Sequence, residues 1–329
     1  MKELKITPNE AGQRLDKLLC KFLNRASKNF IYKMLRKKNI ILNGKKAEGS
    51  ERLETGDVVK LFLSDETICK FSDSRIQKVK TALDILYEDA HVIFVNKPSG
   101  MLSQKAKRTD VSLVEYLLTY LFESGQLSAA QLKTFRPSVC NRLDRNTSGI
   151  VAAGKTLGAL QQLNACFKSR SLQKYYLCLV KGKVSSSRTL RGFLKKEETY
   201  NKVSVTDVSV KKEGLEKSLY GSYIETQYTP LAFADDITLL KVHLITGKTH
   251  QIRAHLASVA HPLIGDYKYG DTSINDWYKR KFGVSSQLLH AYKLVMPYCE
   301  GELSNISEKE ILAPLPHVFQ KILREKGVQ

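Results

Sequence analysis

The stretch Asn141-Arg142-Leu143-Asp144-Arg145-Asn146-Thr147-Ser148-Gly149 leads directly into the apolar run Ile150-Val151-Ala152-Ala153-Gly154. A short apolar run after a Thr-Ser-Gly turn predicts a strand, with the acid on the loop before it. Asp144 is therefore expected on a loop at the edge of a sheet. Most aspartates in loops rich in arginine and asparagine only make turn hydrogen bonds or surface ion pairs, so position alone gives Asp144 no chemical role.

The composition is that of a basic globular protein. Its 329 residues, 42% of them hydrophobic, are enough for two domains and a sizeable core. Lysine and arginine number 53 against 33 aspartate and glutamate, a formal net charge of +20, and the pI is about 9.6. This charge indicates a polyanionic partner, with nucleic acid as the first candidate. An anionic membrane surface and a merely solvated basic surface are the alternatives.

Several classes of protein and site are not indicated. Residues 1–13 lack the apolar segment of a signal peptide, and no apolar run is long enough to span a bilayer, so a cytoplasmic location is expected. The six cysteines form no Cys-x-x-Cys pair, which argues against a disulfide framework or a zinc site. His250, His255 and His261 match no metal motif. We expect neither a metal nor a cofactor.

Residues 1–70 are predicted to form a small basic domain, followed by a linker over 71–80 and a larger domain over 81–329. Apolar residues at helical spacing predict two short helices, the second capped by Ser27, and the Asn43-Gly44 turn indicates a hairpin. The whole polar segment 64–80 lacks periodicity and suits a connection. The basic face would contact RNA phosphates, or would only be solvated. The residues assigned to RNA binding are Arg14, Lys17, Arg25, Lys28, Lys33, Arg36, Lys37 and Lys45.

The larger domain is expected to alternate strands and helices. Alternation over Lys174–Gly182 predicts a strand that turns Tyr176, Cys178 and Val180 to one face. Thr249 is expected to cap a helix with Ile252 on its core face and Arg253 off that face. The other expected elements are two strands within 84–96, a helix over 112–123 capped by Asp110, strands near 203–210, 224–227 and 237–244, a closing strand at 290–294, and a helix within 312–322.

Four segments of the larger domain, in order, resemble the motifs of the RluA family of pseudouridine synthases. The Asp144 stretch is similar to the signature His-Arg-Leu-Asp-x-x-Thr-Ser-Gly, with Asn141 in place of histidine. Lys97-Pro98-Ser99-Gly100 resembles the opening motif, and the Tyr176 strand resembles the second. Residues 247–256 with Gly265-Asp266-x-x-Tyr269-Gly270 resemble the last, with Lys248 replacing an arginine. Residues 12–63 resemble the RNA-binding domain named after ribosomal protein S four.

The resemblance implies an α+β fold, in which a small N-terminal α+β domain precedes a catalytic domain with a mixed, mostly antiparallel sheet flanked by helices. It also implies the isomerisation of uridine to pseudouridine in RNA. Asp144 would be the catalytic carboxylate, Arg253 the cation that keeps it ionised, and Tyr176 the ring that stacks on the uracil. Arg142 would fill the space of the everted base, or only contact a phosphate. Ile252 would line the pocket, or only belong to the helix core.

The substrate is less defined than the reaction. An S-four-like domain beside this core looks like the branch of the family that acts on large-subunit ribosomal RNA, and transfer RNA is the second candidate. The target uridines, the oligomeric state, and the choice between Asp144 attacking C1′ and removing a C2′ proton stay open. A non-catalytic ribosome-assembly factor is an alternative function. A glycoside hydrolase would need two positioned acids, and the motif loops offer one.

Overall fold

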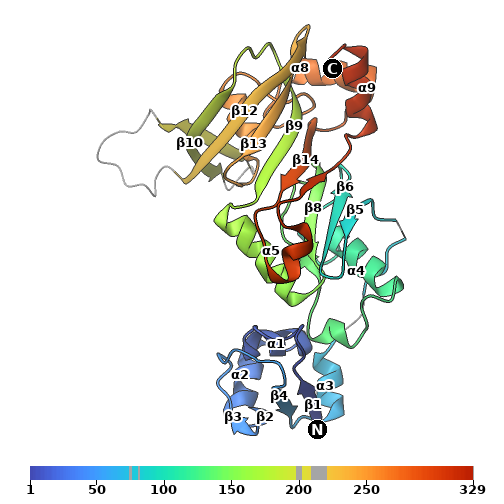
Figure 1. The fold of residues 1–329 in the computed structure, drawn as a ribbon, viewed down its shortest axis with the longest axis vertical. Coiled ribbons are helices and arrows are strands. Elements are labelled where there is room, and N and C mark those ends of the chain that lie inside the picture. Colours follow the sequence, from blue (N-terminus) through green and yellow to red (C-terminus); the bar gives the residue numbers. More distant parts are fainter. Residues whose placement is uncertain (74–75, 81, 198–201, 209–220, 329) are drawn as a thin grey trace.

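The computed structural model describes residues 1–73, 76–80, 82–197, 202–208 and 221–328. Two separate sheets organise this part of the chain, one at the N-terminal end and a much larger one over the rest (Figure 1). Each sheet packs against its own hydrophobic core. The two units contact each other through polar groups, because Asn9 accepts the N–H of Leu157 at 2.9 Å and Thr134 donates to Glu10 at 2.7 Å.

The N-terminal unit packs short helices on a four-stranded antiparallel sheet of order β1-β4-β2-β3. As predicted, helix α1 buries Leu15, Leu18, Leu19 and Phe22, and the Ser27 hydroxyl caps α2 by accepting the N–H of Phe30. The elements of this unit are β1 (Lys2–Lys5), α1 (Leu15–Phe22), α2 (Lys28–Arg36), β2 (Ile40–Leu42), β3 (Lys45–Lys46), β4 (Val58–Leu61) and α3 (Asp65–Phe71).

Helix α3 lies inside the polar segment 64–80, where no regular structure was expected. Ser64 caps it by accepting the N–H of Thr67, and its Ile68 and Phe71 pack against the N-terminal core. The Phe71 ring lies 4.6 Å from that of Phe30. Two apolar residues in one turn show no periodicity, so no helix could be predicted from this segment. The division of the chain at residues 70 and 81 stays a prediction.

The large sheet has eleven strands among the described residues, in the order β11-β10-β12-β13-β9-β14-β8-β6-β5, with β7 beside β8 and β15 beside β14. All its pairs are antiparallel except β8 with β14. The strands are β5 (Ile85–Glu88), β6 (Val92–Lys97), β7 (Ser138–Val139), β8 (Ser148–Gly154), β9 (Gln173–Lys181), β10 (Arg188–Glu197), β11 (Lys202–Asp207), β12 (Ser222–Ala234), β13 (Ile237–Leu244), β14 (Leu289–Val295) and β15 (Glu310–Leu312). The predicted mixed, mostly antiparallel sheet is confirmed.

Helices cover the two faces of this sheet. Alternate residues of β6 and β8 face opposite sides, so Ile93 and Val151 pack under α4 while Phe94 and Ala152 pack under α5. The helices are α4 (Leu113–Glu123), α5 (Leu157–Ser169), α7 (Gln251–Ser258), α8 (Thr272–Phe282) and α9 (His317–Glu325), with 3-10 turns η1 (Gln131–Lys133) and η3 (Gly301–Ile306). No helix in the described ranges combines the length and the apolar content that a membrane span needs.

Strand β14 was expected to close the sheet, but it lies at the centre, between β9 and β8 (Figure 1). Its His290 and Ala291 pair in parallel with Ser148 and Gly149 at the start of β8. Gly149 has φ 114°, and a Cβ there would overlap the backbone of Ala291, so only glycine fits this close approach. The contact fixes the strand that directly follows the Asp144 loop.

Three other predictions for the large domain need correction. Strand β10 was not predicted. The strand expected near 203–210 corresponds to β11, which ends at Asp207, and residues 209–210 lie outside the described residues. Asp110 does not cap α4; Ser112 does, in a capping box with Glu115, while Asp110 accepts N–H groups from the turn before it. The last helix begins at His317, after the Pro316 that ends the preceding extended segment.

Candidate active site

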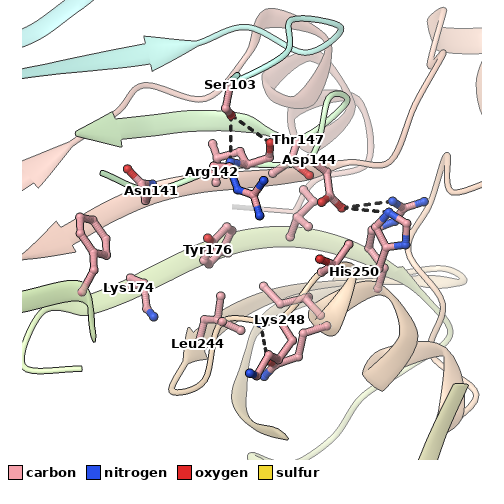
Figure 2. Close-up of a pocket in the computed structure, with 18 of the residues that line it drawn as sticks. Ser103, Asn141, Arg142, Asp144, Thr147, Lys174, Tyr176, Leu244, Lys248 and His250 are labelled. Atoms are coloured by element: carbon pink, nitrogen blue, oxygen red, sulfur yellow. Dashed lines mark hydrogen bonds and ion pairs between the residues drawn. The ribbon is translucent and has the colours of Figure 1, made fainter. Parts of the chain in front are cut away.

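A cleft of about 1030 Å³ opens between the Asp144 loop, strand β9 and the start of α7 (Figure 2). Asp144 is the one acidic residue among those that line it, within the described part of the chain. Eight basic residues line the same cleft: Lys105, Arg142, Lys168, Arg170, Lys174, Lys196, Lys248 and Arg253. A lone carboxylate surrounded by cations suits a polyanionic ligand. The cations would bind the negative charges of the ligand, and the single carboxylate would be the group that reacts with it.

The Asp144 loop is fixed by hydrogen bonds to its backbone. The N–H of Thr147 donates to the Asp144 carbonyl at 3.0 Å, and the Gln287 amide donates to the Thr147 hydroxyl at 3.2 Å. On the other side, the Ser103 hydroxyl both donates to and accepts from the backbone of Leu143, each at 3.0 Å. The loop is therefore held from both flanks, and its carboxylate is presented to the cleft.

Arg253 lies between two carboxylates. Its Nη1 donates to Asp144 Oδ2 at 3.2 Å, while Nε and Nη2 donate to the two oxygens of Asp266 at 2.7 and 2.9 Å. The side chains of Arg253 and Asp266 are 9% and 1% exposed, whereas that of Asp144 is 26% exposed. Asp266 also accepts the N–H groups of Lys268 and Tyr269. Asp266 thus fixes the guanidinium, which then faces Asp144 in one orientation.

The start of α7 agrees with the prediction for Arg253 and differs from it for the cap residue. Arg253 lies off the apolar face and points toward Asp144, as expected, and its pairing with Asp266 lets it be buried there. Thr249 was expected to cap the helix, yet the cap residue is His250, with a left-handed backbone at φ 56° and no side-chain cap bond. The Gln251 amide oxygen instead accepts the N–H of Lys248 at 3.1 Å.

Tyr176 comes from the middle of β9, opposite α7, and its side chain faces the same cleft as Asp144 (Figure 2). It shares the inward face of the strand with Cys178 and Val180, as predicted. Burial raises the pKa of the Tyr176 phenol, and the negative charge of Asp144 raises it further. The ring therefore offers a flat apolar surface and a phenol that keeps its proton.

The two other predicted pocket residues line the same cleft. Arg142 is exposed, two residues before Asp144, and Ile252 is buried on α7 beside Arg253. Asn141, where the family signature has histidine, donates to the Ile150 carbonyl at 3.1 Å and accepts the N–H of Ala152 at 2.8 Å. Its amide thus holds β8 rather than Asp144. Lys248 is exposed at the cleft.

Four residues of the site had no role in the sequence analysis, although two of the quoted motifs contain all of them: Lys97, His250, Asp266 and Tyr269. Lys97 is fully buried beneath the Asp144 loop and donates to the carbonyl groups of Pro98, Met101 and Arg145 at 2.9, 2.9 and 3.1 Å. Burial lowers the Lys97 pKa to about 8, against the opposing effect of the Asp144 charge. The spacing of a motif does not say which of its residues meet in space.

The basic residues predicted to bind RNA in the N-terminal unit are all exposed. Arg14 pairs with Asp16 at 3.1 Å, and Arg25 pairs with Asp73. Within the described residues, no ion pair is seen for the other six: Lys17, Lys28, Lys33, Arg36, Lys37 and Lys45. Across the described ranges, no three His, Cys, Asp or Glu side chains lie close enough together to hold a metal ion.

Known proteins resemble this chain over most of its length. An uncharacterised RNA pseudouridine synthase of Mycoplasma genitalium is 32% identical over 97% of this chain and 98% of its own. A protein of Haemophilus influenzae named ribosomal large subunit pseudouridine synthase C is 31% identical over 99% and 95%. The structure of human RNA pseudouridylate synthase domain containing 4, 22% identical, matches 74% of this chain and 92% of its own with a TM-score of 0.59, which shows the shared fold.

The sequence model of the RNA pseudouridylate synthase family matches residues 91–258, which include the Asp144 loop, Tyr176 and Arg253. This is just over half of the chain. Together with the relatives, it confirms the resemblance that the motifs indicated. The protein therefore belongs to the RNA pseudouridylate synthases, a family of isomerases that act on RNA.

Proposed function

We propose that the protein converts uridines of large-subunit ribosomal RNA to pseudouridine, with Asp144 as the catalytic carboxylate. One observation carries the proposal: a single acid, Asp144, is held against a buried guanidinium in a cleft whose other charged lining residues are basic. The fixed positive charge of Arg253 attracts the carboxylate of Asp144 and holds it toward the cleft. The surrounding cations suit the phosphates of an RNA strand.

The reaction breaks the N1–C1′ bond of a uridine, turns the uracil and joins its C5 to C1′. The proton lost from C5 is balanced by one gained at N1, so no atom is added and no electron is transferred. Asp144 acts either by attacking C1′ or by removing a C2′ proton, and both routes start from the same ionised carboxylate. Arg253, itself fixed by Asp266, holds that carboxylate in place.

The cleft has to receive a base that has left its stack. Unstacking costs a few kcal/mol, which contacts in the cleft must offset. Tyr176 offers a ring for the uracil and Ile252 an apolar wall, and the exposed Arg142 would fill the space that the everted base leaves. The unpaired basic residues of the N-terminal unit would contact phosphates away from the cleft, as an RNA-binding domain does.

The choice of ribosomal RNA rests on the relatives. Several proteins named ribosomal large subunit pseudouridine synthase C align with 97–99% of this chain at 30–31% identity. Because these alignments span both units of the structure, we assign the same class of RNA to this protein, and place its action in the cytoplasm, where ribosomes are assembled.

The test is to incubate the purified protein with unmodified transcripts of large-subunit ribosomal RNA and of transfer RNAs, and to map pseudouridines by a base-selective chemical stop assay. We expect stops at a few uridines of the ribosomal transcript, and none with Asp144→Ala. Stops only in transfer RNA would contradict the substrate. Tight RNA binding without any pseudouridine would support the alternative of a non-catalytic assembly factor.

A further inference from the structure

His250 occupies an unusual position at the edge of the site. It is the residue before α7, and its backbone has φ 56°, a left-handed conformation that costs a non-glycine residue free energy. Its Nε2 faces Asp144 Oδ2 at 3.8 Å (Figure 2). Its Nδ1 lies 3.0 Å from the Tyr269 hydroxyl. Such strain persists where the surroundings fix a side chain, and here those surroundings are Asp144 and Tyr269.

The hydrogen bonds of Tyr269 favour one tautomer of His250. The Tyr269 oxygen accepts the N–H of Val203 at 2.9 Å, so its own proton needs an acceptor. Among the described residues, His250 Nδ1 is the acceptor within reach of that proton. A neutral imidazole that accepts at Nδ1 carries its proton on Nε2. The Nε2–H then faces the negative Oδ2 of Asp144, whereas the other tautomer would turn a lone pair toward it.

The charges around His250 favour this neutral form. Burial is the first cause that lowers the His250 pKa, and the cations Arg253 and Lys268 lower it further, against the opposing charges of Asp144 and Asp266. An imidazolium would also donate from Nδ1, which would break the acceptance of the Tyr269 proton. His250 therefore acts as a directional donor and adds no second positive charge beside Arg253.

We propose that His250 is a positioning residue: held in the Nε2–H tautomer by Tyr269, it aims that N–H at Asp144 Oδ2. Oδ2 is then shared between His250 and Arg253 Nη1, while Oδ1 has no hydrogen-bond donor among the described residues and is left to act on the uridine. At 3.8 Å the contact is loose, and it shortens when a substrate fills the cleft and excludes water. This inference rests on the proposed function, because it assigns the two oxygens of the same carboxylate.

The tautomer can be measured without substrate. In protein with ¹⁵N-labelled histidine, long-range ¹H–¹⁵N correlation spectra distinguish Nδ1–H, Nε2–H and the imidazolium, and His250→Gln identifies the His250 signals. We expect the Nε2–H form at neutral pH. Tyr269→Phe, which keeps the ring but removes the hydroxyl, should shift His250 toward a mixture of tautomers. An Nδ1–H form or an imidazolium in the wild-type protein would overturn the proposal.

Kinetics test the positioning. Asparagine tolerates positive φ, so His250→Asn keeps the backbone but is too short to reach Asp144. Loss of a hydrogen bond to a charged group should lower kcat about 10- to 100-fold with KM unchanged. His250→Gln, whose longer amide can donate, should recover part of that loss. The control is His317→Asn, at an exposed site at the start of α9, which should leave kcat unchanged.

The results distinguish a failure of the positioning role of His250 from a failure of the proposed function. If His250→Asn turns over at the wild-type rate, the positioning role is wrong although the enzyme is active. If the wild-type protein forms no pseudouridine on any transcript, the proposed function is wrong, and the tautomer spectra still decide whether Tyr269 sets the state of His250.

Discussion

The basic residues of this protein fall into two groups that differ in burial and pairing. At the cleft, Arg253 is 9% exposed and bound to two carboxylates, and Lys97 is fully buried under three carbonyl groups. In the N-terminal unit, Lys33, Arg36 and Lys37 are exposed, with no acid paired to them among the described residues. One group holds its charges at fixed distances, and the other leaves them free to move.

This difference separates two tasks. A cation that must act on one carboxylate oxygen needs a single geometry, which burial and a second partner such as Asp266 provide. A cation that must contact an irregular chain of phosphates gains from being solvated and mobile, and its contribution depends on salt. Changes in the first group should therefore alter the rate or the folding, and changes in the second should alter affinity alone.

The largest effect is expected for Asp144→Asn. The amide keeps the size of the side chain but can neither attack a sugar nor remove a proton, so the single-turnover rate should fall by about 10⁴-fold or more. RNA affinity should stay the same or increase, because the one acid in a cleft of cations is removed. Rates and filter binding on the same transcript measure both. A tenfold loss of affinity would show that the two tasks are not separate.

A smaller effect, on folding, is expected for Asp266→Asn. Because Arg253 is buried, loss of its bidentate partner should lower the free energy of unfolding by about 3 kcal/mol. The control is Glu310→Gln, which breaks a pair with Lys293 that is more exposed than the Arg253–Asp266 pair and should cost less than about 1 kcal/mol. Urea denaturation compares the two. Equal losses would mean that burial does not distinguish the ion pairs of this protein.

Lys97 predicts a dependence of stability on pH. Its pKa in the folded protein is lowered by burial to about 8, below the ordinary 10.5. Between these values the unfolded chain binds more protons than the folded one, so the free energy of unfolding should rise as the pH increases from 8 to 10.5. The rise should be absent from Lys97→Met, and the difference between the two profiles isolates Lys97. Parallel profiles would place the Lys97 pKa outside this window.

The smallest effect is expected from neutralising exposed charges. Changing Lys33, Arg36 and Lys37 together to glutamine should weaken RNA binding and reduce the slope of log affinity against log salt by about 2, since each phosphate contact contributes roughly 0.7. A matched triple in the last turn of α8, Lys279, Arg280 and Lys281, should leave the slope unchanged. Equal effects of the two triples would remove the special role of the N-terminal unit in RNA binding.

The fold class and the main site residues could be predicted from local apolar patterns and from the motifs. The α+β fold and the mixed sheet are confirmed. They could be predicted because strands such as β8 and β9 have clear apolar patterns bounded by turns. The proximity of Asp144 and Arg253, 109 positions apart, came from the family motifs, and the structure places them 3.2 Å apart. The catalytic roles of Asp144, Tyr176 and Arg253 stay predictions.

What the sequence did not show depends on contacts between distant segments. The central place of β14 follows from pairing with β8 and β9, which lie more than 100 residues earlier. The burial of Arg253 depends on Asp266, whose carboxylate is itself fixed by backbone N–H groups of a later turn. The left-handed backbone of His250 breaks the usual capping rule, and no residue pattern announces it.

The central place of β14 also has a consequence for synthesis of the protein. The family match ends at residue 258, yet the strand that joins β8 to β9 spans Leu289–Val295. A nascent chain that ends at residue 258 already contains strands β8 and β9, yet the facing edges of these two strands are still open, and other chains can pair on them. The enzyme therefore cannot complete its sheet until Leu289–Val295 has been translated, and termination at residue 258 should yield an aggregation-prone product rather than a smaller enzyme.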